Sequence, residues 1–156
     1  MNDLTIRQIV VRGHGKTDSI IDLEPGVNVI LGPSNTGKSM VVDCIDYLFG
    51  GSTPPFNPDE TGYNSVKMTL ANARGEGLHV ARDIECNEGE ERAAGIVTVV
   101  SSIPGIDSGT YSTKNSMQAK GVTYGDILLK LIDIDDRIEI IKNQSGKGVL
   151  LTPRTF

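Results

Sequence analysis

Residues 27–39 read VNVILGPSNTGKS, a short apolar run that leads directly into a glycine-rich loop. The run from Val27 to Leu31 predicts a buried strand. Residues 32–39 match the pattern G-x-x-x-x-G-K-[ST] at every position, which is typical of a loop that cradles phosphate groups. From Lys38 onward, apolar residues recur at helical spacing and predict the buried face of a helix: Val41, Val42, Ile45, Leu48 and Phe49. The glycines at 50 and 51 predict the end of that helix. The order of strand, loop and helix therefore predicts an α/β fold of the P-loop type.

The residue types of the loop explain why it would bind phosphate. Gly32 and Gly37 let successive backbone N–H groups converge on one anion, and Asn35 tolerates a left-handed backbone. The Lys38 ammonium is expected to reach the β- and γ-phosphates, and the Ser39 hydroxyl is expected to be one ligand of a Mg²⁺ ion. The candidate cofactor-binding residues are Gly32, Ser34, Asn35, Thr36, Gly37, Lys38 and Ser39.

The rest of the chain is predicted to consist of short strands with few helices. Alternating or β-branched patterns predict strands over residues 4–11, 20–23, 66–70, 78–84 and 96–100, and a last hairpin over 138–141 and 149–151. Thr123 and Asp126 resemble a capping box at the start of a short helix. Residues 52–64 contain three prolines, and residues 101–116 are rich in Ser, Gly and Thr, so both segments are predicted to be loops without regular structure.

The composition excludes several classes of protein. The chain has 156 residues, of which 38% are hydrophobic and 22% are charged, and this fits one globular domain. The chain has no apolar run long enough to span a membrane and no apolar signal-peptide core, so we expect a cytoplasmic location. The net charge of −5 argues against a surface that coats nucleic acid. Cys44 and Cys86 lie far apart without a CxxC pattern, which predicts neither a zinc site nor a disulfide framework.

The chain lacks an evident hydrolytic apparatus. Hydrolysis needs a carboxylate at the end of an apolar strand to hold the metal, and a group that activates water. Residues 131–136 read LIDIDD and predict a helix end and a solvated turn, so no catalytic residue is assigned. The residues themselves leave two interpretations open. The chain is either a complete small P-loop kinase or nucleotide hydrolase that uses Asp133 or Asp135, or a non-enzymatic β-rich interaction domain.

The stretch NVILGPSNTGKSMVVDCIDYLFGG, followed by a proline-containing loop and the hairpin SVKMTL…GLHVARDI, resembles the N-terminal head lobe of SMC-like ABC ATPases. This resemblance implies an α/β, ABC-type head lobe with an N-terminal antiparallel β subdomain and few helices. It implies ATP and Mg as cofactors, and ATPase activity only after the lobe joins its C-terminal lobe and dimerises. It also implies a role in DNA repair, chromosome organisation or defence against foreign DNA.

The same resemblance implies partners and further site residues. Residues 1–156 would form a single N-terminal ATPase lobe, completed by its own C-terminal lobe or by a second head in a homodimer-like sandwich. DNA would be contacted through the full complex, and no membrane contact is implied. A coiled coil is expected to begin near residue 153, where Thr152 and Pro153 form a good helix start. Gln144 is the positional candidate for a metal ligand beside Ser39. Arg82 resembles an arginine common in that strand, and its position also fits an aliphatic stem in the core with its charge at the rim.

Overall fold

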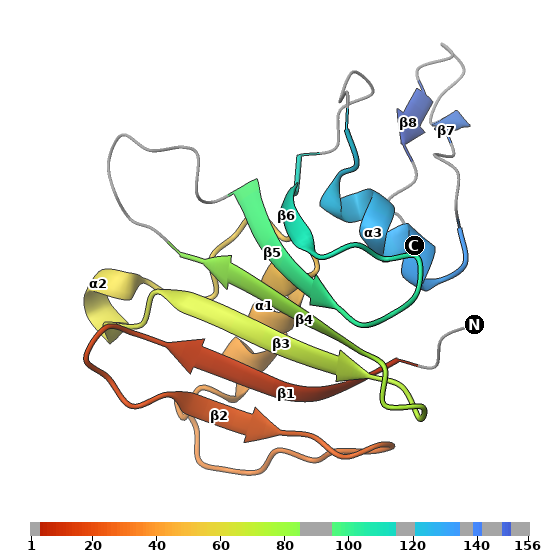
Figure 1. Ribbon diagram of the computed structural model, residues 1–156. Helices are drawn as coiled ribbons and strands as arrows, with labels where there is room; N and C mark the ends of the chain where they lie inside the picture. The colour runs from red at the N-terminus through yellow and green to blue at the C-terminus, as the bar shows by residue number, and fades with distance from the viewer. Residues whose placement is uncertain (1–3, 85–94, 115–120, 135–138, 142–147, 151–156) are drawn as a thin grey trace.

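A six-stranded antiparallel sheet organises the protein (Figure 1). The computed structural model describes residues 4–84, 95–114, 121–134, 139–141 and 148–150. The sheet has the order β2-β1-β3-β4-β5-β6. Its strands are β1 (Thr5–Arg12), β2 (Ser19–Asp22), β3 (Ser65–Ala71), β4 (Gly77–Asp83), β5 (Ile96–Ser101) and β6 (Gly109–Ser112). A separate hairpin pairs β7 (Glu139–Ile141) with β8 (Gly148–Leu150). These strands confirm the predicted hairpin over 66–84, the strand near 96–100 and the last hairpin.

The sheet buries one face and leaves the other open. In β3, Val66, Met68 and Leu70 are buried, whereas the alternate residues are partly exposed. The same alternation occurs in β4, because side chains of successive strand residues point to opposite faces. Helix α1 (Lys38–Leu48) covers the buried face and contacts β3 and β4, and it lies behind the sheet in Figure 1. The hydrophobic core therefore lies between α1 and the sheet.

The predicted apolar face of α1 is only partly correct. Val41 and Leu48 are buried as expected, but the Val42 side chain is 66% exposed. Cys44 and Tyr47 take its place in the core, each with 1% of its surface exposed. The helix is therefore rotated so that Val42 faces away from the antiparallel sheet.

Arg82 holds the C-terminal end of α1 from within the core. The side chain is 2% exposed, and its guanidinium carbon lies 3.8 Å from the centre of the Tyr47 ring. Its Nη1 donates hydrogen bonds to the carbonyl oxygens of Tyr47 at 2.7 Å and Gly51 at 2.5 Å. The last turn of α1 has no basic residue of its own, so Arg82 supplies the cation that the negative end of the helix dipole favours. The expectation that this charge lies at the rim of the core is wrong, because the helix end offers buried acceptors.

A second helix, α3 (Tyr124–Leu131), joins the same core. Its N-terminus carries the predicted capping box, in which the Thr123 side chain accepts from the backbone of Asp126 and the Asp126 side chain accepts from the backbone of Thr123. The Tyr124 hydroxyl donates a hydrogen bond of 2.7 Å to the carbonyl oxygen of Leu48. The end of α1 is thus held by Arg82 and by Tyr124, which come from two different elements.

Two segments predicted as irregular contain regular elements. Residues 52–64 include the one-turn helix α2 (Pro58–Thr61), where the Asn57 side chain accepts from the Asp59 backbone N–H and Pro58 occupies the first turn. Proline is compatible with that position because its missing N–H would have no partner within the helix. Residues 101–116 include β6, which forms the edge of the sheet beside β5. The first prediction is wrong because Asn57 and Pro58 form a helix start, and the second is wrong because β5 provides a strand for β6 to pair with.

The predicted buried strand from Val27 to Leu31 is wrong. These residues have no regular structure, and they lie outside the six-stranded sheet. Val27 is 94% exposed, Val29 73% and Leu31 87%. Strand geometry requires a neighbour for its backbone groups, and the part of the chain that the structure describes provides none for this run. All strand pairs among the described residues are antiparallel. Of the strand, loop and helix that the sequence predicts for a P-loop fold, the structure contains the loop and α1 but not the strand before the loop.

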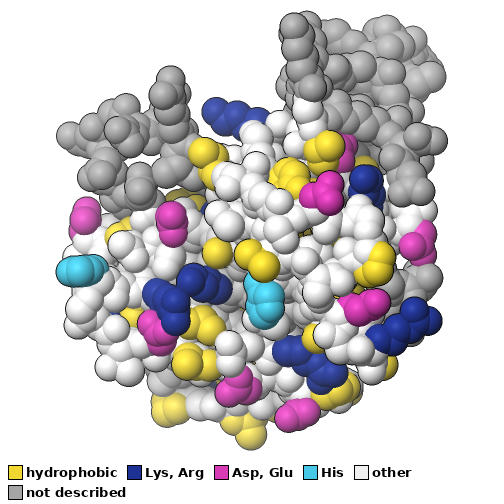
Figure 2. All heavy atoms as spheres, viewed as in Figure 1, with side chains coloured by type: hydrophobic (Ala, Val, Ile, Leu, Met, Phe, Trp, Pro, Cys, Tyr) yellow, Lys and Arg dark blue, Asp and Glu magenta, His cyan; other side chains and the backbone are white. Residues whose placement is uncertain are grey.

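The open face of the sheet carries no single type of side chain. Cationic, acidic and hydrophobic side chains are interspersed on the face seen in Figure 2. Arg12 forms an ion pair with Asp18 at 2.6 Å, and the Thr69 hydroxyl lies 3.0 Å from His79 Nδ1. Of the helices that the structure describes, none is long and apolar enough to cross a membrane.

Replacing Arg82 by methionine should destabilise the protein. The variant keeps an apolar stem but leaves the carbonyl oxygens of Tyr47 and Gly51 without these buried bonds, so we expect a loss of about 3 kcal/mol in the free energy of unfolding. Urea denaturation monitored by circular dichroism measures this loss. Arg74→Met, at an exposed turn between β3 and β4, is the control and should change stability by less than about 0.5 kcal/mol. Equal stability of both variants would contradict the role of Arg82.

Candidate phosphate-binding site

The loop between residues 32 and 37 is wrapped rather than extended. Asn35 has a φ of 62° and Gly37 a φ of 79°, so both adopt the left-handed backbone that the sequence predicts for such a loop. Gly37 is also the N-cap of α1. The chain therefore reverses direction within a few residues and delivers Lys38 and Ser39 to the first turn of the helix.

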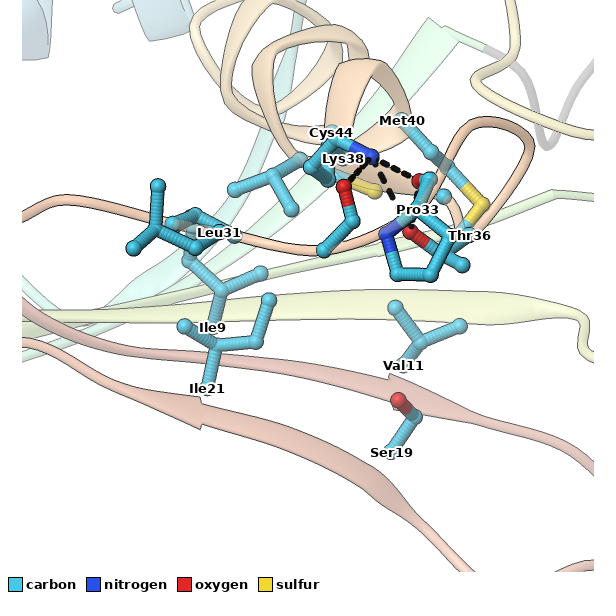
Figure 3. Close-up of a pocket in the computed structure, with 14 residues that line it drawn as sticks. Ile9, Val11, Ser19, Ile21, Leu31, Pro33, Thr36, Lys38, Met40 and Cys44 are labelled. Carbon is cyan, nitrogen blue, oxygen red and sulfur yellow. Dashed lines mark hydrogen bonds between the residues drawn. The ribbon is translucent and has the colours of Figure 1, made fainter.

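Lys38 folds back over the loop that precedes it. Its Nζ donates to the carbonyl oxygen of Gly32 at 2.9 Å, to that of Pro33, and to Thr36 Oγ1 at 3.2 Å (Figure 3). The ammonium is thus held at the mouth of the loop by oxygen atoms of the loop itself. Contact with the terminal phosphates of a nucleotide would replace at least one of these bonds, because an ammonium has only three protons.

The start of α1 is available to an anion. Its N-cap residue is Gly37, which has no side chain that could accept a hydrogen bond from the first backbone N–H groups of the helix. These groups and the helix dipole together favour a negative charge at this end. Ser39 is exposed in the first turn, where its hydroxyl is accessible to a hydrated Mg²⁺ bound to phosphate. The residues present therefore fit a magnesium–nucleotide complex.

A cavity of about 340 Å³ lies beneath the loop. Its walls come from β1 and β2, from the first turns of α1 and from residues 30–38. Figure 3 shows Val11 and Ser19 on the strand side facing Pro33 and Thr36 on the loop side. The walls are mainly apolar, with Ile9, Ile21, Leu31 and Met40 among them. The loop is thus supported on one side by the helix and stands clear of the sheet on the other.

Cys44 lines this cavity and has an unreactive thiol. Burial, with a smaller contribution from the charge of Asp43, raises the pKa of Cys44 to about 11. Because the thiolate is the nucleophilic form, the thiol is inert near neutral pH. Cys44 therefore serves as a packing residue and not as a catalytic one.

The structure brings together all seven residues predicted to bind the nucleotide, since they are consecutive or nearly so around one turn. Asp133, the carboxylate of the kinase alternative, lies on an exposed turn after α3 and is not among the residues lining the cavity. Gln144, Asp135 and the pair Thr152–Pro153 lie outside the described residues. In the described part of the chain, no group of three or more His, Cys, Asp or Glu side chains is placed to hold a metal ion.

Two features of the site were not found from the sequence. The first is the contact of Thr36 with Lys38, which depends on the curled loop and not on residue type alone. The second is the exposure of the apolar run before the loop. The apolar run by itself predicts a buried strand, but a sequence pattern does not reveal whether the segment that would bury it is present.

Comparison with known protein families identifies a related domain family. A family model described as an AAA domain matches residues 4–150, which is nearly the whole chain. No curated protein and no solved structure matches the sequence.

Stability should fall in alkaline solution as the buried acids of this region ionise. The folded protein raises the pKa of Cys44 from 9.0 to about 11, and burial also raises the pKa values of Tyr47 and Tyr124, whose hydroxyls donate hydrogen bonds. The unfolded chain loses these protons at lower pH than the folded chain. The contribution of these groups to the free energy of unfolding is therefore constant below pH 9 and declines as the pH rises towards 11. Urea denaturation at a series of pH values measures this decline.

Thiol reactivity provides an independent check. In a Cys86→Ser variant, Cys44 is the only remaining thiol. We expect it to resist an aromatic disulfide reagent at pH 8 in the folded protein and to react fully in urea. Rapid reaction of the folded variant would contradict the buried, protonated state of Cys44.

Proposed function

Because the chain belongs to the AAA domain family, we propose that it binds Mg-ATP through residues 32–39 as one half of an SMC-like ATPase head. The family supports nucleotide binding by a P-loop ATPase. The observation that carries the proposal is the closed loop, with Lys38 Nζ 2.9 Å from the carbonyl oxygen of Gly32 and an uncapped helix start beside it. In a loop of this kind, backbone N–H groups and the lysine ammonium would converge on one phosphate group.

The chain's own residues have distinct tasks in this proposal. Gly32 and Gly37 allow the backbone to approach the phosphates, and Lys38 neutralises charge on the terminal phosphate oxygens. The Ser39 hydroxyl would hold Mg²⁺, which supplies positive charge between the β- and γ-phosphates when it is bound. Gln144 remains a proposed second metal ligand from the family resemblance alone.

The apolar run before the loop supports a half-head and not a complete enzyme. Val27, Val29 and Leu31 are almost fully exposed, and their backbone groups make no hydrogen bond among the described residues. Val42 presents a further exposed apolar side chain on α1. Exposed β-branched residues with unpaired backbone groups form a template for added strands. A second lobe that pairs with this run would turn it into the interior strand that its sequence predicts.

We propose that this second lobe is the C-terminal lobe of the same ATPase, and that two such heads then enclose two nucleotides at their interface. The support is that the exposed run leads directly into Gly32, so the added lobe would lie beside the phosphates. DNA repair, chromosome organisation or defence against foreign DNA follows only from the resemblance to SMC-like ATPases. With a net charge of −5, contact with DNA would have to come from a local surface of the full complex.

Lys38→Ala should weaken ATP binding strongly. The variant loses a charge-assisted contact to phosphate, so we expect the dissociation constant of Mg-ATP to rise about 10- to 100-fold. Isothermal titration calorimetry of the 156-residue chain measures this. Lys67→Ala, on the open face of the sheet, removes the same charge away from the loop and should bind like the wild type. Equal affinity of wild type and Lys38→Ala would refute the assignment.

The isolated chain should bind ATP but hydrolyse it very slowly. The half-head lacks the residues of the second lobe, so we expect a turnover rate far below about 1 per second, which is the lower end of the range for ordinary kinases. A phosphate-release assay with Mg-ATP tests this. Turnover near that rate, abolished by Asp133→Asn, would instead favour a complete small kinase or hydrolase.

A further inference from the structure

We propose that Thr36 is a positioning residue for Lys38. Its hydroxyl holds the lysine ammonium at the mouth of the loop before any nucleotide arrives, so that the charge is already in place for the terminal phosphates. This inference rests on the proposed nucleotide binding and deepens it, because it assigns one side chain a task that the phosphate-binding pattern leaves open at this position.

The hydrogen bonds of Thr36 have a consistent direction. Thr36 Oγ1 donates its only proton to the carbonyl oxygen of Pro33 at 2.9 Å. Its lone pairs are then free to accept from Lys38 Nζ, which lies 3.2 Å away. The Pro33 carbonyl oxygen also accepts from Lys38 Nζ. Hydroxyl, carbonyl and ammonium therefore form a closed triangle in which each member orients the other two.

Gly32 leaves the space that this triangle needs. A Cβ atom at Gly32 would lie 3.2 Å from Thr36 Oγ1 and 4.0 Å from Lys38 Nζ. The first of these separations is tighter than ordinary van der Waals contact, so a side chain there would press on the hydroxyl. Gly32 thus has a second role besides close approach to phosphate. It leaves space for the hydrogen bond between Lys38 Nζ and Thr36 Oγ1.

Thr36 is the only side chain among the three oxygen sources that hold Lys38. The other two are the backbone carbonyls of Gly32 and Pro33, which every sequence in this conformation would offer. In the described residues, no carboxylate pairs with Lys38. The sequence can therefore tune the position of the ammonium chiefly through residue 36.

The effect on binding follows from the entropy of the lysine side chain. A free lysine must lose most of its rotamer freedom when it engages phosphate, and a lysine that is already held loses less. Removing the hydroxyl should therefore weaken nucleotide binding even though Thr36 itself need not touch the nucleotide. Thr36 is exposed in a loop, so the fold should tolerate the change.

The test compares Thr36→Val, which keeps the shape and removes the hydroxyl, with Thr36→Ser, which keeps the hydroxyl. We expect Thr36→Val to weaken Mg-ATP binding about three- to tenfold by calorimetry, and Thr36→Ser to restore most of the affinity. Thr110→Val, an exposed threonine in β6 at the far edge of the sheet, controls for the general effect of the substitution. If Thr36→Ser is as weak as Thr36→Val, the inference is wrong.

A double-mutant cycle shows whether Thr36 acts through Lys38. In a Lys38→Met background, titrated at millimolar Mg-ATP, Thr36→Val should change affinity by less than about twofold, because the side chain that it positions is gone. The nucleotide-free protein provides a second measurement: the ¹³Cε resonance of Lys38 should shift in Thr36→Val and keep its wild-type position in Thr36→Ser.

The outcomes separate this inference from the proposed function. An unshifted Lys38 resonance in Thr36→Val, or the same fold-loss with and without Lys38, would overturn the positioning role while leaving nucleotide binding intact. Wild-type protein that fails to bind Mg-ATP would overturn the proposed function, and with it the inference. Loss of affinity only with Lys38 present, together with the shifted resonance, would support both.

Discussion

The packing of α1 against the antiparallel sheet is the constraint on which the site depends. The helix is held at its C-terminal end by Arg82 and Tyr124, which bond to the carbonyl oxygens of Tyr47, Gly51 and Leu48. With that end fixed, its N-terminal end has a defined direction, and the phosphate-binding loop begins there. The helix dipole favours a cation at its C-terminal end, where Arg82 is buried, and an anion at its N-terminal end, where phosphate is expected. The core and the site are therefore two ends of one element.

The curled conformation of the loop rests on local contacts. Left-handed backbone at Asn35 and Gly37 turns the chain, and the triangle formed by Pro33, Thr36 and Lys38 closes it. These contacts lie within seven residues of sequence, so they need little help from the rest of the fold. The ammonium is bound by the loop's own oxygens, which is compatible with a site prepared before its ligand arrives.

The apolar run before the loop lies in an environment that does not match its sequence pattern. Val27, Val29 and Leu31 have the pattern of an interior strand, yet they are exposed and unpaired in the described chain. Such a conflict between local pattern and tertiary environment is expected where a surface awaits a partner. It links the half-head proposal to the site, because the unpaired run is covalently continuous with the first glycine of the loop.

The sequence by itself determined the features that depend on neighbours along the chain. The strands of the β3–β4 hairpin, the start of α1, the left-handed loop residues and the capping box at Thr123 all follow from short-range periodicity or from single residue types. The tertiary structure decided the burial of residues for which the sequence pattern predicts a different environment. It placed Cys44 and Tyr47 in the core instead of Val42, drew the charge of Arg82 inside, and left residues 27–31 uncovered. The physical reason is that burial depends on which distant segment packs against a residue. A sequence pattern indicates that a side chain is apolar, but it does not identify the segment that would cover it.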